Sequence, residues 1–205
     1  MSEIAHLAAT LFRKAGRTGR VMVAIAGPPG AGKSALAEAL LPLLPEGTAA
    51  VVAMDGFHYD NAVLDVRGLL PRKGAPETFD FEGFRHLLER LRRADAEVAA
   101  PLFDRRTDVS RAGAVTVPAD IRFVLVEGNY LLLDESPWYG LGPLFDVTVW
   151  LDVPRAELDL RLVQRWLDHG HTLEAARARV LANDLPNAER VLARRRQADV
   201  TIGGA

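Results

Sequence analysis

Cysteine is absent from this sequence of 205 residues, and so are long apolar runs and any excess of positive charge. Without cysteine there is no disulfide framework and no thiolate zinc site. No apolar run reaches the roughly 20 residues that a membrane-spanning helix needs, so no membrane partner is expected. The formal net charge of −2 removes the usual electrostatic case for binding nucleic acid. Any binding of phosphate groups must therefore depend on a local group of residues and not on the overall charge.

The remaining composition, with 49% hydrophobic and 25% charged residues, is that of an ordinary globular protein and predicts one domain over residues 1–205. Near the N-terminus an acid, Glu3, comes first and basic residues follow the apolar part, which is the reverse of a signal peptide. We therefore expect a cytoplasmic protein. The sequence leaves a homodimer open.

Short apolar runs without period-two alternation predict strands that are buried on both faces, as in a parallel sheet covered by helices. Segments with helical spacing alternate with them, which predicts an α/β fold with a mainly parallel sheet. The expected strands are Val21–Ala26, Ala49–Met54, Phe123–Val126, Val147–Leu151 and a short edge strand, Val200–Ile202. The expected helices are Ile4–Lys14, Lys33–Leu44, Phe81–Arg93, Pro154–His169 and Thr172–Ala182.

Two stretches, Gly56–Pro76 and Asp104–Gly113, are rich in Gly, Pro, Arg and Asp and show no clear periodicity. We expect irregular loops there, and long irregular loops in a compact domain usually serve a function. Asp80 is expected to cap the helix that follows it.

The segment GPPGAGKS, residues 27–34, matches G-x-x-x-x-G-K-[ST] between a predicted strand and a predicted helix. Its glycines let successive backbone N–H groups point at phosphate oxygens, at the positive end of the helix. Lys33 is expected to bridge the β- and γ-phosphates and Ser34 to bind Mg²⁺. This predicts a P-loop NTPase with a three-layer α/β/α fold and with ATP and Mg²⁺ as cofactors. The predicted nucleotide-binding residues are Gly27, Gly30, Ala31, Gly32, Lys33, Ser34 and Ala35.

Two carboxylates follow predicted strands, at the edge of the sheet where open α/β folds bind ligands. Asp55 is placed to accept the proton of an attacking hydroxyl group, although a turn-forming Asp before Gly56 is the alternative. Glu127 is placed to support Mg²⁺ directly or through water, and its alternative is a buried structural carboxylate.

Basic residues near these carboxylates complete the predicted site. Arg161 and Arg165 lie four residues apart on one flank of a predicted helix, where they can clamp the transferring phosphoryl group or form a solvated salt-bridging flank. The loops could supply an acceptor pocket rich in hydrogen-bond donors, although a residue of this kind taken alone is more often a surface or turn residue. Its candidates are His58, Arg72, Lys73, Glu77, Asp104, Arg105 and Arg106. His169 and His171 complete no metal-ligand set and receive no role.

Six segments occur in order: GPPGAGKS from Gly27, MDGFHYDN from Met54, RKGAPETFD from Arg72, PLFDRRTD from Pro101, EGNYLLLDE from Glu127 and NDLPNAERV from Asn183. With them the chain resembles, over nearly its whole length, the phosphoribulokinase, uridine kinase and pantothenate kinase family of P-loop kinases. DGFHYDN, RKGAPETFD and EGNYLLL together look most like the bacterial group described as putative fructose transport system kinases.

The resemblance implies that Asp55 is the catalytic base, that Lys33 and Ser34 hold the nucleotide and metal, and that residues of about 155–185 form a small helical lid with Arg161 and Arg165. It also implies that Asn183 and Asn187 lie near the adenine. From the residues alone, a helix break at Pro186 with Asn187 as the next cap is the favoured interpretation.

The predicted function is transfer of the γ-phosphate of Mg-ATP to a hydroxyl group of a small sugar-like acceptor, with fructose as one candidate. A uridine-like nucleoside or a pantothenate-like compound is the near alternative, and Gly56-Phe57-His58 after the acid departs from typical uridine kinases. A function from another class, a nucleotide-driven regulatory ATPase switch, would not need Asp55 beside an acceptor pocket.

Overall fold

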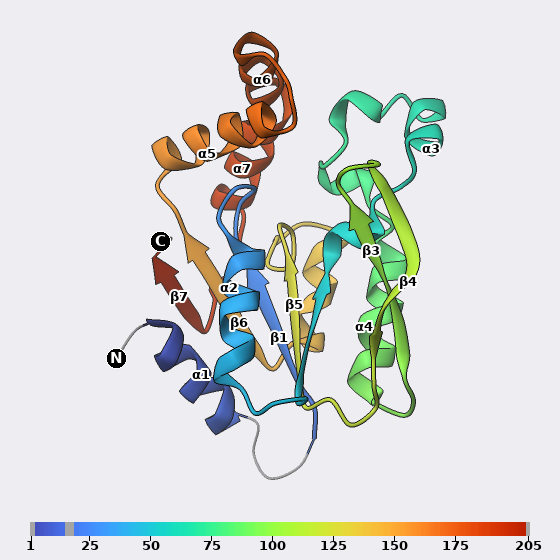
Figure 1. The fold of residues 1–205 in the computed structure, drawn as a ribbon, viewed down its shortest axis with the longest axis vertical. Coiled ribbons are helices and arrows are strands. Elements are labelled where there is room, and N and C mark those ends of the chain that lie inside the picture. The colour runs from blue at the N-terminus through green and yellow to red at the C-terminus, as the bar shows by residue number, and fades with distance from the viewer. Residues whose placement is uncertain (1–2, 15–18, 204–205) are drawn as a thin grey trace.

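Five parallel strands form the centre of the fold, in the spatial order β2–β5–β1–β6–β7. The structure is a computed structural model that describes residues 3–14 and 19–203. The prediction of an α/β fold with a mainly parallel sheet is confirmed (Figure 1). The strands are β1 (Val21–Ala26), β2 (Ala49–Ala53), β5 (Phe123–Gly128), β6 (Val147–Asp152) and β7 (Val200–Gly203).

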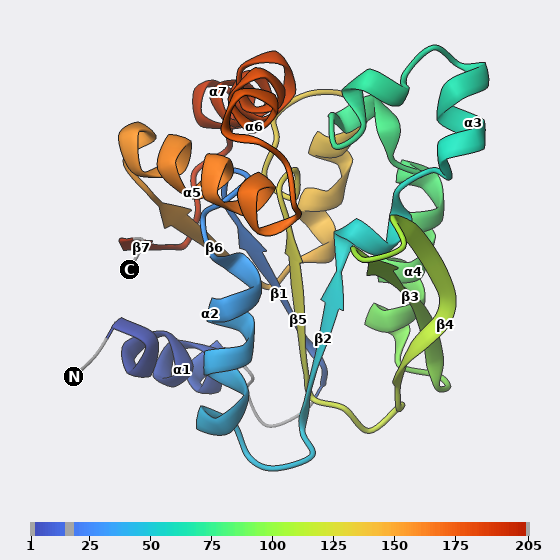
Figure 2. The ribbon, with the colours of Figure 1, turned by 45° about the horizontal axis from the view of Figure 1, so that its top comes forward.

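Helices cover both faces of this sheet and complete the three predicted layers (Figures 1 and 2). Val23 of β1 packs toward α1 and α2, while Met22 packs on the other face toward α4 and α7. Because alternate side chains of a strand point to opposite faces, β1 must be apolar throughout. The covering elements are α1 (Glu3–Lys14), α2 (Lys33–Leu40), α4 (Phe81–Arg93), the 3₁₀ segment Trp138–Leu144 and α7 (Leu185–Ala193).

An antiparallel hairpin of β3 (Val98–Asp104) and β4 (Val109–Val117) packs on the α4 side of the sheet. The prediction that 104–113 is irregular is therefore wrong for most of that stretch. The sequence does not indicate the hairpin, because most of β4 lies partly or fully exposed and shows no buried apolar run.

Three other expectations are corrected in detail. The predicted helix 33–44 ends as an α-helix at Leu40 and continues as a 3₁₀ turn, where Pro42 has no N–H to donate. Strand β2 ends at Ala53, and a 3₁₀ turn begins at Met54. The stretch 56–76, expected to be irregular, contains the short helix α3 (Asn61–Val66) and a further 3₁₀ turn, Leu70–Arg72.

The last helices lie over the carboxyl ends of the strands, at the top of Figure 1. We call residues 155–184 the helical arm: α5 (Arg155–Asp168), α6 (Leu173–Arg179) and a π-helical turn, Val180–Asp184, that leads directly into α7. The predicted break at Pro186 with Asn187 as a cap is wrong, because the chain stays helical from the π-helical turn into α7 and Asn187 lies inside α7.

Leu162 and Val180 of the arm form, with Leu185 of α7, a small apolar cluster separate from the two clusters that cover the sheet. Movement of the arm as a lid stays a prediction. Among the helices of the described residues, none combines the length and apolarity that crossing a bilayer requires.

Asp80 caps α4 as the sequence predicts, because its Oδ1 accepts a hydrogen bond of 3.0 Å from the backbone N–H of Gly83. Asp80→Ala should lower the free energy of unfolding by about 1 kcal/mol, since it leaves this N–H without its cap. Asp80→Asn should retain most of the stability, because Asn caps equally well. Chemical denaturation measures both, and equal losses in the two variants would contradict the capping role.

Candidate active site

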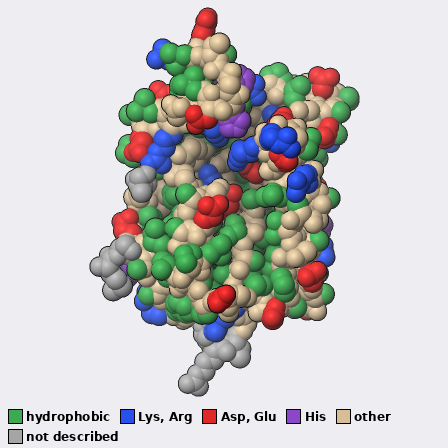
Figure 3. All heavy atoms as spheres, in the orientation of Figure 1, with side chains coloured by type: hydrophobic (Ala, Val, Ile, Leu, Met, Phe, Trp, Pro, Cys, Tyr) green, Lys and Arg blue, Asp and Glu red, His purple; other side chains and the backbone are tan. Residues whose placement is uncertain are grey.

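The carboxyl ends of three neighbouring strands bring the predicted site residues together. Ala26 of β1 is level with Gly128 of β5, and Ala53 of β2 is level with Glu127. The glycine-rich loop, Asp55 and Glu127 therefore start from the same edge of the sheet, as expected for ligand sites in open α/β folds. Figure 3 shows a hollow above this edge, below the helical arm, with Lys and Arg side chains around its rim.

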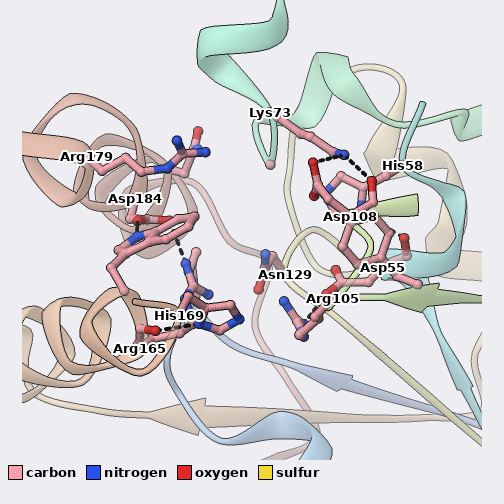
Figure 4. Close-up of a pocket in the computed structure, with 15 residues that line it drawn as sticks. Asp55, His58, Lys73, Arg105, Asp108, Asn129, Arg165, His169, Arg179 and Asp184 are labelled. Atoms are coloured by element: carbon pink, nitrogen blue, oxygen red, sulfur yellow. Dashed lines mark hydrogen bonds and ion pairs between the residues drawn. The ribbon is translucent and has the colours of Figure 1, made fainter. Parts of the chain in front are cut away.

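Two connected pockets occupy this region. The P-loop pocket lies on the glycine-rich loop, and its lining includes Gly30, Gly32, Lys33, Ser34, Ala35, Glu127 and Arg161. The outer pocket, drawn in Figure 4, extends between the helical arm and the loops, and its lining includes His58, Lys73, Phe103, Asp108, Trp166, His169, Arg179, Asp184 and Asn187. Pro29, Asp55, Arg105, Asn129 and Arg165 line both pockets and thus mark their boundary.

The glycine-rich loop needs glycine at two positions. Gly30 and Gly32 have φ of 82° and 91°, a left-handed conformation that residues with a side chain rarely adopt. A Cβ at Gly30 would also lie 3.3 Å from Leu162, so glycine permits the close approach of α5 to the loop. Of the other predicted loop residues, Gly27 is buried, and Ala31 lines an apolar hollow beside the P-loop pocket, with Ala35, Leu36 and Ile202.

Lys33 is buried, with 8% of its surface exposed. Its Nζ donates to the carbonyl of Pro28 at 3.0 Å and to Oδ1 of Asn129 at 2.7 Å. An ammonium group has three donors, so one remains for a phosphate oxygen. Burial lowers the pKa of Lys33, although the carboxylates of Glu127 and Asp55 oppose this shift. Asn129 was not predicted, although its place two residues after Glu127 at a strand end was a usable signal.

Ser34 and Glu127 form an oxygen-rich pair, because Ser34 Oγ donates to Glu127 Oε1 at 3.2 Å. Burial, and then the negative charge of Asp55, raise the pKa of Glu127. Hydroxyl and carboxylate oxygens are the donors that Mg²⁺ prefers, and Mg²⁺ usually completes its shell with water and phosphate oxygens. Among the described residues, no group of three or more His, Cys, Asp or Glu side chains could hold a metal ion. Ser34 and Glu127 therefore fit a cation that takes its other ligands from a bound nucleotide.

Asp55 lies in the turn after β2 and pairs with Arg105, whose Nη2 is 2.5 Å from Asp55 Oδ2. Arg105 comes from the turn between β3 and β4, fifty positions along the chain. Burial opposes ionisation of Asp55, but the charges of His58, Arg105 and Lys33 hold its pKa below its ordinary value. Asp55 is therefore a carboxylate at neutral pH, at the boundary of the two pockets.

His58 lies on the outer-pocket side of Asp55, with its ring between those of Phe79 and Phe103, at centroid distances of 4.0 and 4.7 Å. Its Nδ1 lies 2.8 Å from the backbone carbonyl of Asp55, which can only accept, so Nδ1 carries a proton. Burial lowers the pKa of His58. In the neutral ring, Nε2 is left as an acceptor for a hydroxyl group.

Lys73 connects three segments. Its Nζ donates to Oδ1 of Asn61 at 2.7 Å and pairs with Asp108 Oδ2 at 3.0 Å, which joins α3 to the hairpin turn. Its backbone carbonyl accepts a bond of 2.8 Å from Asn183 of the helical arm. Asn187 in turn donates to Asn183 at 3.2 Å. Both asparagines thus lie on the side of the outer pocket, and their predicted contact with adenine stays a prediction.

Four residues of the predicted acceptor set are not among the described residues that line the two pockets: Arg72, Glu77, Asp104 and Arg106. Arg72 pairs with Glu77 at 2.8 Å. Asp104 accepts the backbone N–H of Arg106 at 3.0 Å and so shapes the hairpin turn. For these residues the turn and surface alternative describes the placement better than the pocket prediction.

Arg161 and Arg165 both line the P-loop pocket, and both also form ion pairs. Arg161 pairs with Glu157 one turn earlier on α5. Arg165 pairs with Asp184 at 2.9 Å. The two alternatives from the sequence, a phosphate clamp and a salt-bridged flank, are thus compatible in one geometry. Asp184 and His169 were not predicted to belong to the site, and His169 follows Arg165 at helical spacing.

No family model matches the chain. Among curated proteins, the uncharacterized protein YggC of Escherichia coli is 39% identical over 188 residues, which cover 89% of this chain and 77% of YggC. The putative uridine kinase C227.14 of Schizosaccharomyces pombe is 34% identical over 180 residues, covering 82% and 76% of the two chains. The pantothenate kinase of Parvibaculum lavamentivorans is 32% identical over 157 residues, and the chain spans about half of its length, 48%.

Two solved structures are similar to this fold. A putative fructose transport system kinase from Silicibacter sp. TM1040 is 48% identical, with a TM-score of 0.93 over 98% of this chain and 100% of that one. Phosphoribulokinase from Rhodobacter spheroides is 12% identical, with a TM-score of 0.56 over 90% of this chain and 70% of that one, so it supports the fold alone.

Proposed function

We propose that this chain, which belongs to the family of P-loop kinases that contains uridine kinases and pantothenate kinases, transfers the γ-phosphate of Mg-ATP to a hydroxyl group of a sugar-like acceptor. The observation that carries the proposal is the position of Asp55. Its carboxylate lies where the P-loop pocket meets the outer pocket, so a nucleotide on one side and an acceptor on the other would both reach it.

The nucleotide side of the site follows from the residues already described. Backbone N–H groups of the glycine-rich loop and the remaining donor of Lys33 would bind the phosphates. Ser34 and Glu127 would hold Mg²⁺, which when bound offsets negative charge on the β- and γ-phosphates. The apolar hollow beside Ala31 and Ala35 offers a surface for the adenine ring, as an alternative to the side of the outer pocket where Asn183 and Asn187 lie.

On the acceptor side, the hydroxyl oxygen attacks the γ-phosphorus while the bond from phosphorus to the β–γ bridging oxygen breaks. ADP leaves, and the hydroxyl proton passes to Asp55, which the low pKa keeps ionised until that step. Arg165 stands at the same boundary and can stabilise the charge on the phosphoryl group in transit.

Fructose is one candidate acceptor, because the solved relative that is 48% identical carries a fructose transport name. A nucleoside or a pantothenate-like acceptor is the alternative that the curated relatives supply.

The test is a panel of sugars, sugar acids, sugar phosphates, nucleosides and pantothenate, each incubated with the full chain and Mg-ATP. ADP release is measured, and the phosphorylated product is identified by mass. We expect at least one sugar-like compound to raise ADP release and to gain a phosphoryl group. ATP hydrolysis that no acceptor accelerates would instead favour the regulatory ATPase switch.

A further inference from the structure

We propose that the acceptor carries a carboxylate or phosphate group, and that Arg179 binds this group on the wall of the outer pocket opposite Asp55. The inference rests on the proposed kinase function and specifies its substrate class. The acceptor is then a polyhydroxy acid or a sugar phosphate rather than a neutral sugar or a nucleoside.

The first argument is the balance of charge in the outer pocket. Its lining has four Lys and Arg side chains and three carboxylates, so one positive charge is left over. The three carboxylates are already matched with cations. The pairs are Asp55 with Arg105 at 2.5 Å, Asp108 with Lys73 at 3.0 Å, and Asp184 with Arg165 at 2.9 Å.

Arg179 is the cation left over. Within the part of the chain that the structure describes, it forms no ion pair with a carboxylate, and its one ring contact places the guanidinium 4.3 Å from the centroid of Trp166. Trp166 is itself held by its Nε1, which donates to Asp184 at 2.6 Å. A guanidinium held over a fixed ring keeps its N–H donors available, and its planar fork matches carboxylate and phosphate.

The nucleotide does not account for this charge. Lys33, Arg161 and Arg165 line the P-loop pocket, whereas Arg179 lines only the outer pocket. Figure 4 shows Arg179 with Asp184 on one wall and Asp55 with Arg105 and His58 on the other. An acceptor that spans the pocket would therefore present a hydroxyl group to Asp55 and an anion to Arg179.

The aromatic residues of the pocket argue against a nucleoside. The ring of Phe103 contacts the ring of His58, at a centroid distance of 4.7 Å, and the ammonium of Lys73, which lies 5.0 Å from its centroid. The ring of Trp166 contacts the guanidinium groups of Arg179 and Arg165, and that of Arg165 lies 5.3 Å from its centroid. A base that stacked on either ring would have to displace a charged or aromatic neighbour, which lowers the gain from stacking.

The experiment compares matched acceptors with the full chain and Mg-ATP: a neutral sugar, the corresponding sugar acid and the corresponding sugar phosphate, with a nucleoside alongside. The sugar acid tests whether the anionic group of the acceptor is a carboxylate, and the sugar phosphate tests whether it is a phosphate. The variant is Arg179→Gln. Its matched control is Arg177→Gln, which removes an exposed arginine of α6 that does not line the pocket.

We expect an anionic acceptor to be used best by the wild-type chain. Arg179→Gln should raise its KM about 10- to 100-fold, which is the range for loss of a charge-assisted hydrogen bond. The KM for ATP should stay within a factor of about three, and Arg177→Gln should change neither constant. Arg179→Lys should restore part of the loss, because it keeps the charge but not the fork.

A neutral sugar or a nucleoside as the best acceptor would overturn this inference and leave the kinase function intact. So would an anionic acceptor whose KM is the same in wild type and Arg179→Gln. If no acceptor of any class is phosphorylated while ATP is still hydrolysed, the proposed kinase function fails and this inference fails with it.

Discussion

Asp55→Asn should lower acceptor-dependent turnover by about 10²- to 10⁴-fold, because it removes the group that takes the hydroxyl proton. The amide keeps the size of the carboxylate and can still accept a hydrogen bond from Arg105. ATP binding should therefore change little. Initial rates with the best acceptor and a direct titration of Mg-ATP measure the two effects separately.

The matched control is Asp65→Asn, since Asp65 is an exposed residue of α3 outside both pockets. It should leave turnover unchanged. If Asp55→Asn kept full acceptor-dependent turnover, another group would have to take the proton. If it instead lost ATP binding, Asp55 would serve the nucleotide or its metal ion.

Lys33→Ala should weaken ATP binding and lower turnover by about 10²- to 10³-fold, because a preorganised positive charge at the phosphates disappears. The change also leaves Pro28 and Asn129 without their shared donor. Both readouts should fall together, in contrast to Asp55→Asn. Calorimetric titration of Mg-ATP and steady-state rates provide the measurements.

Lys14→Ala is the control for the loss of a lysine, because Lys14 is exposed at the end of α1. It should leave both constants at their wild-type values. A thermal melt of each variant shows whether the fold is retained. A folded Lys33→Ala chain that bound Mg-ATP as tightly as wild type would contradict the role of Lys33 in the loop.

Local patterns in the sequence predicted the parallel sheet and the edge at which the glycine-rich loop, Asp55 and Glu127 lie. The run from Val21 to Ala26 and the glycine-rich loop after it are continuous in the chain, so their conformation follows from neighbouring residues. Asp55 and Glu127 could be placed because each lies at the carboxyl end of a strand, Asp55 in the turn after β2 and Glu127 as the next-to-last residue of β5. The hairpin of β3 and β4 could not be predicted, because its mostly exposed strand β4 has no apolar period.

The sequence by itself determined the P-loop, the α/β class and the two carboxylates at the strand ends. The tertiary structure alone decided which partner each of them meets: Arg105 for Asp55, Asn129 for Lys33 and Asp184 for Arg165. It also showed that Arg72 and Glu77 pair with each other, and that Arg179 lines the outer pocket. Contacts between distant positions depend on how whole elements pack, and no local spacing records that packing.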